Sequence, residues 1–185
     1  MKKLDEMTLE ELWQLFPIIL AEHNPNWRIW YNEEIVNLKG ILHKGIEYYH
    51  IGSTAIKEIW AKPIIDILIV VNVKSEIAQI AKRLQDNDYI IMSQSSNRIS
   101  LNKGYTQNGF SEKVFHLHIR LKDDIDELYF CKYLNEHFEV AKEYEKLKLQ
   151  LWKEFEHNRD GYTTAKTEFI KKYTLLAKEF YCTFN

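Results

Sequence analysis

Hydrophobic positions near the N-terminus recur with the spacing of amphipathic helices. Thr8 and Glu11 form a capping box and leucines follow at helical spacing, so a short helix is predicted to end near Leu15. The segment "IILAEH", residues 18–23, is a candidate edge strand. An asparagine–proline pair, which is typical of a helix start, then predicts a second helix over residues 25–43.

The middle of the chain changes to the pattern of strands. The runs "IEYYHI" (46–51) and "IIDILIVV" (64–71) are β-branched and aromatic, and the second is apolar on both faces, as in the central strand of a covered sheet. An amphipathic helix capped by Ser75 is predicted next. Three further strands are expected over residues 89–93, 98–103 and 113–121.

The chain from about residue 124 onward reads as helical. Three helices are expected there, with breaks near Glu139 and near residues 158–161. The order of elements predicts an α+β fold in which helices back a mixed sheet. We expect one domain over residues 1–185, with a sheet core at about 16–122 and a helical C-terminal region at about 123–185.

Composition adds few constraints. The 25 basic and 27 acidic residues nearly balance, so the sequence has no strong nucleic-acid signal and any polyanion must be met locally. The two cysteines, Cys131 and Cys182, lack metal or redox spacing. The N-terminal residues lack the apolar stretch of an export signal, and the longest apolar tract is too short to span a bilayer. These features favour a cytoplasmic protein without membrane contact.

The turn "HIGSTA" is the first candidate for chemistry. Gly52 permits a close backbone approach, and Ser53 places a hydroxyl beside exposed N–H groups, so the turn could hold a phosphate. A short helix through "TAIKEI" would add its dipole to that attraction. The alternative is a strand-exit turn with a serine cap.

Asp66 is the second candidate, because an ionised carboxylate in an apolar strand costs several kcal/mol unless something neutralises it. Lys62 is one possible partner, and a divalent cation is the other. His116 and His118 lie two apart on a predicted strand and therefore share a face. With Asp66 they could form a two-histidine, one-carboxylate metal site, which His50 could join; otherwise they are hydrogen-bonded histidines on a solvated face.

Together the segments "HIGSTAI", "AKPIIDILIVV" and "FHLHI" resemble three signatures of the GrpB family, a branch of the nucleotidyltransferase superfamily. The segments "NPNWRIWYNEE" and "RDGYTTAKTEFI" are similar to its N-terminal and C-terminal regions. The resemblance covers most of the chain and implies a nucleotidyltransferase-like mixed β-sheet flanked by helices, with a helical C-terminal region. It also implies that a Gly-Ser turn precedes the strand that carries the metal-binding carboxylate.

The resemblance also shows a departure. Polymerase-type members carry two acids in the form Asp-x-Asp and a third on a later strand, which together hold two Mg²⁺ ions. Here position 68 is leucine, so only Asp66 remains, and the later strand offers His116 and His118. The expected cofactor is therefore a divalent metal ion, Mg²⁺ or Mn²⁺ or another transition metal, held by Asp66, His116 and His118, with Asp66 and His118 as catalytic residues.

Four further residues are candidate ligand contacts. Lys62 and Arg98 flank the strands and could meet phosphate oxygens, or could serve as ion-pair partners. Tyr162 and Lys166 are four apart on a helix and could close over a cleft. The expected partner is a nucleotide or other phosphorylated small molecule, and transfer of a nucleotidyl group is the activity considered. The alternatives are a non-catalytic binding module derived from such an enzyme, and a single-metal enzyme.

Overall fold

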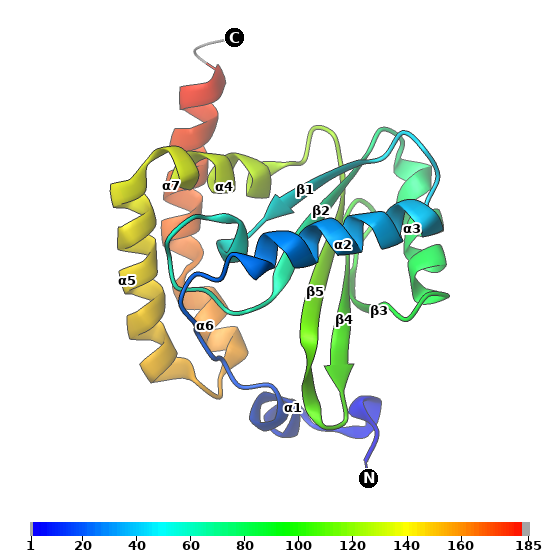
Figure 1. Cartoon of the computed structure of the whole chain (residues 1–185), viewed down its shortest axis with the longest axis horizontal. Coiled ribbons are helices and arrows are strands. Elements are labelled where there is room, and N and C mark those ends of the chain that lie inside the picture. The colour runs from blue at the N-terminus through cyan, green and yellow to red at the C-terminus, as the bar shows by residue number, and fades with distance from the viewer. Residues whose placement is uncertain (1, 183–185) are drawn as a thin grey trace.

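The computed structural model describes residues 2–182 and is built on one five-stranded sheet (Figure 1). The strand order is β1-β2-β5-β4-β3. Strand β2 pairs in parallel with β5 and all other pairs are antiparallel, so the sheet is mixed as predicted. The strands are β1 (Glu47–Ile51), β2 (Ile65–Val71), β3 (Ile90–Gln94), β4 (Ile99–Thr106) and β5 (Gly109–Leu121).

Two helices cover one face of this sheet, α2 (Asn26–Ile41) and α3 (Lys74–Gln85), and α1 (Leu9–Leu15) lies at the far end of the β4–β5 hairpin (Figure 1). The main core joins α2 and α3 to alternate residues of β2 and β5, among them Ile65, Ile67 and Ile69. Because side chains alternate along a strand, Asp66 and the even-numbered positions of β2 face the other way. The covered face therefore leaves Asp66 on the side of the C-terminal helices.

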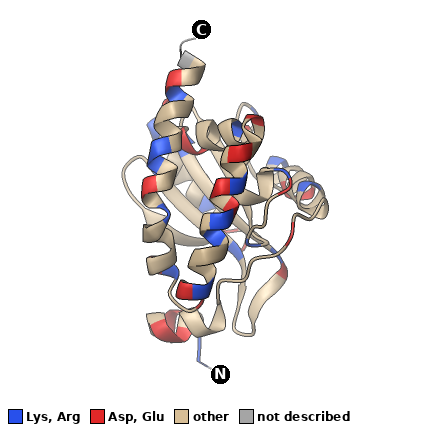
Figure 2. Ribbon diagram, turned by 90° about the vertical axis from the view of Figure 1, so that its left-hand side faces the viewer, with Lys and Arg blue, Asp and Glu red and all other residues tan. Residues whose placement is uncertain are grey.

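The C-terminal region forms a second layer beside the sheet. It contains α4 (Asp126–Glu136), α5 (Phe138–Phe155), α6 (Arg159–Ala165) and α7 (Thr167–Cys182). A separate core joins α4, α5 and α7 and includes Ile56 and Ile59 from the β1–β2 connection. Figure 2 shows Lys and Arg interspersed with Asp and Glu along the outer helices, so their outer side is of mixed charge.

Several predicted boundaries are corrected by the structure. Residues 18–23 form no strand beyond one bridge between Ala21 and Ala61, so the predicted edge strand was wrong. Helix α3 begins at Lys74 rather than after a Ser75 cap, because the Glu76 carboxylate accepts the Val73 N–H. Only residues 53–55 form a 3-10 turn where a helix through "TAIKEI" was considered.

The C-terminal prediction also missed one break. Four helices rather than three are present, because the chain turns between α6 and α7 as well as at the two predicted breaks. The short N-terminal helix and its Thr8 capping box are confirmed. No helix within residues 2–182 has the length and apolar composition needed to cross a membrane.

Candidate functional site

The parallel pairing of β2 and β5 brings Asp66 and the two histidines together. Asp66 lies opposite His116 in the register, and His118 is two residues further along the same face. The Asp66 Oδ1 atom is 3.1 Å from His118 Nε2 and 3.4 Å from His116 Nδ1. The convergence of these three side chains is therefore a consequence of strand order and of the two-residue period of the strands.

The outer ring nitrogens of both histidines also have partners. Ser100 Oγ lies 3.3 Å from His118 Nδ1, and Tyr105 Oη lies 2.8 Å from His116 Nε2. Arg159 donates to Tyr105 Oη at 3.2 Å, which leaves the tyrosine proton for His116 Nε2. His116 Nδ1 is then the protonated nitrogen that faces Asp66. Each group in the chain therefore donates to the next, from Arg159 through Tyr105 and His116 to Asp66.

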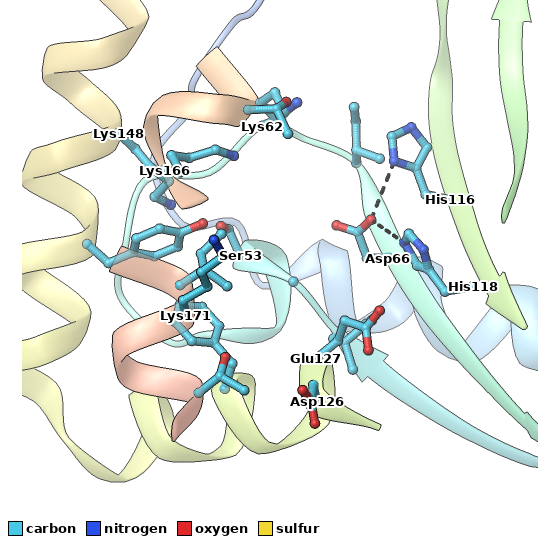
Figure 3. Close-up of a pocket in the computed structure, with 18 of the residues that line it drawn as sticks. Ser53, Lys62, Asp66, His116, His118, Asp126, Glu127, Lys148, Lys166 and Lys171 are labelled. Carbon is cyan, nitrogen blue, oxygen red and sulfur yellow. Dashed lines mark hydrogen bonds and ion pairs between the residues drawn. The ribbon is translucent and has the colours of Figure 1, made fainter. Parts of the chain in front are cut away.

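These contacts set the charge of the Asp66 carboxyl. Burial alone raises its pKa, but the hydrogen bonds from His116 and His118 outweigh that effect and hold the pKa well below its usual range. Burial lowers the pKa of His116, although Asp66 partly opposes the change. Asp66 is thus an ionised carboxylate, and its Oδ2 atom points into the cavity, away from the histidines (Figure 3).

The turn between β1 and β2 lies against this carboxylate. Gly52 has φ of 70°, and an added Cβ would stand 2.9 Å from the Asp66 carboxyl carbon. Ser53 follows, and burial raises the pKa of the neighbouring Tyr144 hydroxyl to about 12, a shift that the Ser53 side chain partly opposes. Only glycine permits this close approach of the turn to the carboxylate.

Four cationic side chains gather around the cavity. Lys62 precedes β2, Lys148 lies on α5, and Arg159 and Lys166 are at the two ends of α6. The Lys62 and Lys166 ammonium groups lie 5.5 Å and 4.2 Å from the centre of the buried Tyr162 ring. Figure 3 shows the three lysines together across the cavity from Asp66.

This cation cluster, defined as Lys62, Lys148, Arg159 and Lys166, lacks internal neutralisation. Among residues 2–182, none of the four forms an ion pair with a carboxylate. Burial lowers the pKa of Lys62 and of Lys148 to about 7, and that of Lys166 to about 8, and repulsion within the cluster adds to each shift. Gathering cations in this way is costly unless an anion compensates them.

The space between the cluster and Asp66 is a cavity of about 600 Å³. Its wall includes all six residues predicted as ligand contacts from the sequence, which are Gly52, Ser53, Lys62, Arg98, Tyr162 and Lys166. Asp66, His116 and His118 line it as well. A volume of this size is in the range of small-molecule and cofactor sites.

Three basic residues, Arg98, Lys62 and His50, have partners other than those considered from the sequence. The Arg98 guanidinium lines the cavity but is paired with Asp124, whose carboxylate is 2.6 Å from Nε and raises the arginine pKa. Lys62 does not pair with Asp66, because the histidines take that place. His50 stacks on Tyr31 at 4.7 Å and does not join the Asp66 cluster.

The side chains expected to hold a metal ion meet at Asp66. Within residues 2–182, no group of three or more His, Cys, Asp and Glu side chains is placed to hold a metal ion. The inward nitrogens of His116 and His118 instead share one oxygen of Asp66 as hydrogen-bond partners. As arranged, the three side chains form a hydrogen-bonded cluster that does not fit a metal centre.

Sequence reasoning missed Lys148, Arg159 and Tyr105. Lys148 is 1% exposed and lies on the buried stripe of α5 between Tyr144 and Leu151, so a lysine at core spacing was an available signal. Arg159 shares a helical face with Tyr162, three residues later. Tyr105 gave no signal, because only the hairpin geometry carries its hydroxyl to His116.

Comparison with solved structures identifies the class of fold. The structure of the Cid1 poly(U) polymerase, an H336N mutant bound to MgATP, aligns with a TM-score of 0.51 over 80% of this chain and 47% of the other, at 11% identity. The chain therefore has a nucleotidyltransferase-like fold. At that identity the likeness concerns the fold alone.

The chain belongs to the GrpB family, whose model, described as GrpB protein, matches residues 17–175. The crystal structure of the conserved protein GrpB from Enterococcus faecalis is 32% identical and aligns with a TM-score of 0.76 over 88% of this chain and 99% of that one. Glutamate-rich protein GrpB of Alkalihalophilus pseudofirmus is 29% identical over 83% of this chain and 91% of its own. UPF0157 protein YqkA of Bacillus subtilis is 32% identical over 88% of this chain, which spans 49% of YqkA.

Proposed function

We propose that this protein binds a nucleotide or other phosphorylated small molecule in the cavity between the cation cluster and Asp66. The observation that carries the proposal is the cation cluster itself, since its four side chains have no carboxylate partner within residues 2–182. A phosphate group would supply two negative charges and several acceptor oxygens at that place. Binding of the phosphate would thus relieve the repulsion among the four cations of the unliganded protein.

Each part of the wall has a role in this proposal. Lys62, Lys166 and Arg159 hold the phosphate oxygens, and Lys148 supports them from α5, where its ammonium group also donates to the Trp60 carbonyl. The Ser53 hydroxyl lies between the cluster and Asp66 (Figure 3). Because Asp66 is negative, it repels phosphate from its own side and so directs the ligand toward the lysines.

Transfer of a nucleotidyl group is the activity we propose to test on this ligand. Asp66, held in place by His118, presents an oxygen that receives no hydrogen bond from the described residues, and this oxygen could orient an acceptor hydroxyl by accepting its hydrogen bond. The acceptor oxygen would bond to the α-phosphorus as the bond to the β-phosphate breaks, the hydroxyl proton would pass to water, and the cation cluster would stabilise the charge on the leaving pyrophosphate. These are the roles that we assign to the predicted catalytic residues Asp66 and His118.

A non-catalytic binding module is the main alternative. Leu68 stands where polymerase-type relatives have the second acid, and it is fully buried in an apolar cluster with Ile51 and Val70. The position of the missing carboxylate is therefore occupied by an apolar side chain of the core. A module of this kind would keep the ligand affinity of the cavity and show no turnover.

A single-metal enzyme is a further candidate, favoured by the convergence of two imidazoles on Asp66. An ion would have to replace the hydrogen bonds that now join His116 and His118 to the carboxylate. Titration of the metal-stripped protein with Mn²⁺ and Zn²⁺ tests this candidate. Stoichiometric binding that His118→Ala removes would support it, and no binding would leave the hydrogen-bonded cluster as the working state.

The main experiment is calorimetric titration of the metal-stripped protein with ATP, CTP, GTP, UTP and pyrophosphate, alone and with Mg²⁺ or Mn²⁺. We expect binding that Lys166→Ala weakens at least tenfold. Lys82→Ala is the matched control, because Lys82 is an exposed lysine of α3 already paired with Asp86. Equal affinities for wild type and Lys166→Ala would contradict the proposal.

The same preparations separate an enzyme from a module. A sensitive assay of pyrophosphate release over a panel of acceptors would be run with wild type and Asp66→Asn. Reproducible turnover that Asp66→Asn abolishes would support nucleotidyl transfer. Tight binding without turnover in any combination would favour the module.

A further inference from the structure

A second, smaller cavity of about 220 Å³ adjoins the candidate site. Its wall is largely aromatic and aliphatic. The rings of Phe16, Tyr105 and Phe110 pack against one another with centroid distances of 4.8 to 5.2 Å. Ile19 and Val114 add to the apolar wall, and the polar residues Ser111 and Glu112 also line the pocket. We call this space the aromatic pocket.

The aromatic pocket and the main cavity share part of their walls. Lys62, Ile64 and Arg159 line both spaces. Tyr105 also joins them, since its ring lines the aromatic pocket while its hydroxyl bonds Arg159 and His116. The partition therefore combines two long cationic side chains, Lys62 and Arg159, with Ile64 and the hydroxyl end of Tyr105.

Within this partition, the Arg159 side chain has few polar contacts. Its guanidinium donates one hydrogen bond, to Tyr105 Oη at 3.2 Å, and lies 5.9 Å from the centre of the same ring. Within residues 2–182 it has no carboxylate partner. A long side chain held by one 3.2 Å hydrogen bond to an uncharged acceptor can change rotamer, so a ligand could bridge the two spaces.

The residues around the pocket also expose apolar surface. Phe110 is 37% exposed and Ile19 is 49% exposed. An apolar group placed between them would remove that surface from water, while the cations of the partition would select a ligand that also carries negative charge. A ligand that carries both an apolar group and a negative charge therefore fits the two spaces better than a purely apolar or a purely anionic ligand.

We propose that the aromatic pocket binds an uncharged aromatic group of the same ligand whose phosphate occupies the cation cluster. This inference rests on the proposed function and narrows it, because it defines the ligand as an aryl-bearing organic phosphate. The available volume suffices, since a protein cavity of about 150 Å³ takes up benzene. Arg159 and Lys62 then contact the phosphate where the two spaces meet.

The test compares two phosphate monoesters of equal charge, phenyl phosphate and methyl phosphate, by nuclear magnetic resonance titration. The wild type should bind phenyl phosphate on the order of tenfold more tightly, because only the phenyl group fills the aromatic pocket. Phe110→Ala should remove most of this preference and leave the methyl phosphate affinity unchanged. Ile19→Ala, at another exposed residue of the pocket wall, provides a second variant in case Phe110→Ala unfolds the hairpin.

Phe138→Ala is the matched control, since Phe138 is an exposed phenylalanine of α5 outside both cavities. If both esters bind with equal affinity, or if neither pocket variant changes their ratio, the aromatic pocket is not a ligand subsite and only this inference is overturned. If pyrophosphate and both esters fail to bind, the proposed function falls as well. A preference that the pocket variants remove and Phe138→Ala keeps supports the inference.

Discussion

Gly52 is packed directly against the Asp66 carboxyl group, at a backbone φ of 70°. Substitution Gly52→Ala should therefore have two effects. The positive φ and the contact with Asp66 should together destabilise the fold by about 2 kcal/mol or more. Displacement of the carboxylate should also weaken ligand binding in the main cavity, as measured by titration with pyrophosphate.

Gly45→Ala separates the two causes. Gly45 also has a positive φ, 97°, but an added Cβ would meet no heavy atom within 4 Å. It should show only the backbone cost of about 1 kcal/mol, without any change in ligand affinity. If urea unfolding gives the same loss of stability for both variants, the contact of Gly52 with Asp66 is unimportant.

Lys166 is expected to serve binding at the expense of stability. It lies near Lys62 and Arg159 with no carboxylate partner in the described part of the chain, and burial lowers its pKa to about 8. Lys166→Met should remove the repulsion and raise the free energy of unfolding of the unliganded protein by roughly 1 kcal/mol. The measurement is urea denaturation at pH 7.

The control for this variant is Lys82→Met on α3, whose lysine is highly exposed and paired with Asp86. Removing such a surface pair should change stability by no more than about 0.5 kcal/mol. A clear loss of stability in Lys166→Met would show that Lys166 acts as a structural residue and would argue against an anion site at the cluster.

The part of the site around Asp66 could be predicted because side chains alternate between the two faces of a strand. His116 and His118 were assigned to one face of a strand from their spacing, and Asp66 was identified as a lone charge in an apolar strand. The resemblance at "HIGSTAI" added Gly52 and Ser53. That β2 and β5 are neighbours, however, depends on a pairing between residues about fifty positions apart, which local patterns do not specify.

The cationic half was less accessible from the sequence. Lys62 and Lys166 were candidates, but Lys148 and Arg159 reach the cavity only because α5 and α6 pack beside the sheet. The orientation of helices depends on tertiary packing, which single residues in a helical pattern do not reveal. The fold also pairs Arg98 with Asp124, and this pair could not be predicted because the two residues lie far apart in the sequence.

Anion binding should depend on pH in the direction set by the lysines. In the folded chain the pKa values of Lys62 and Lys148 are about 7 and that of Lys166 is about 8. Their charge is therefore present near pH 6 and is lost as the pH rises through 7 to 9. Affinity for sulfate, whose own charge is constant in this range, should fall at least tenfold between pH 6 and pH 9 by calorimetry.

Stability should change in the opposite direction over a related window. An unfolded lysine has a pKa near 10.4, so between about pH 7 and pH 10 the unfolded chain binds more protons than the folded one. The contribution of these lysines to stability therefore increases as the pH rises through that window. A sulfate affinity that does not change with pH would contradict the lowered pKa values.

Glu34 provides a test of the fold away from the site. It is 6% exposed on α2, and its carboxylate accepts hydrogen bonds from Tyr89 and, at 3.0 Å, from Lys103 on β4. Lys103→Met should destabilise the protein by about 3 kcal/mol, because it leaves a buried carboxylate without its cation.

Lys113→Met is the matched comparison, since Lys113 on β5 pairs with the exposed Glu33. That surface pair should contribute about 1 kcal/mol or less. The double variant Lys103→Met with Glu34→Leu should recover part of the loss, because it replaces a broken ion pair by apolar contacts. Equal losses for Lys103→Met and Lys113→Met in urea denaturation would mean that burial of Glu34 does not control the strength of its pairing with Lys103.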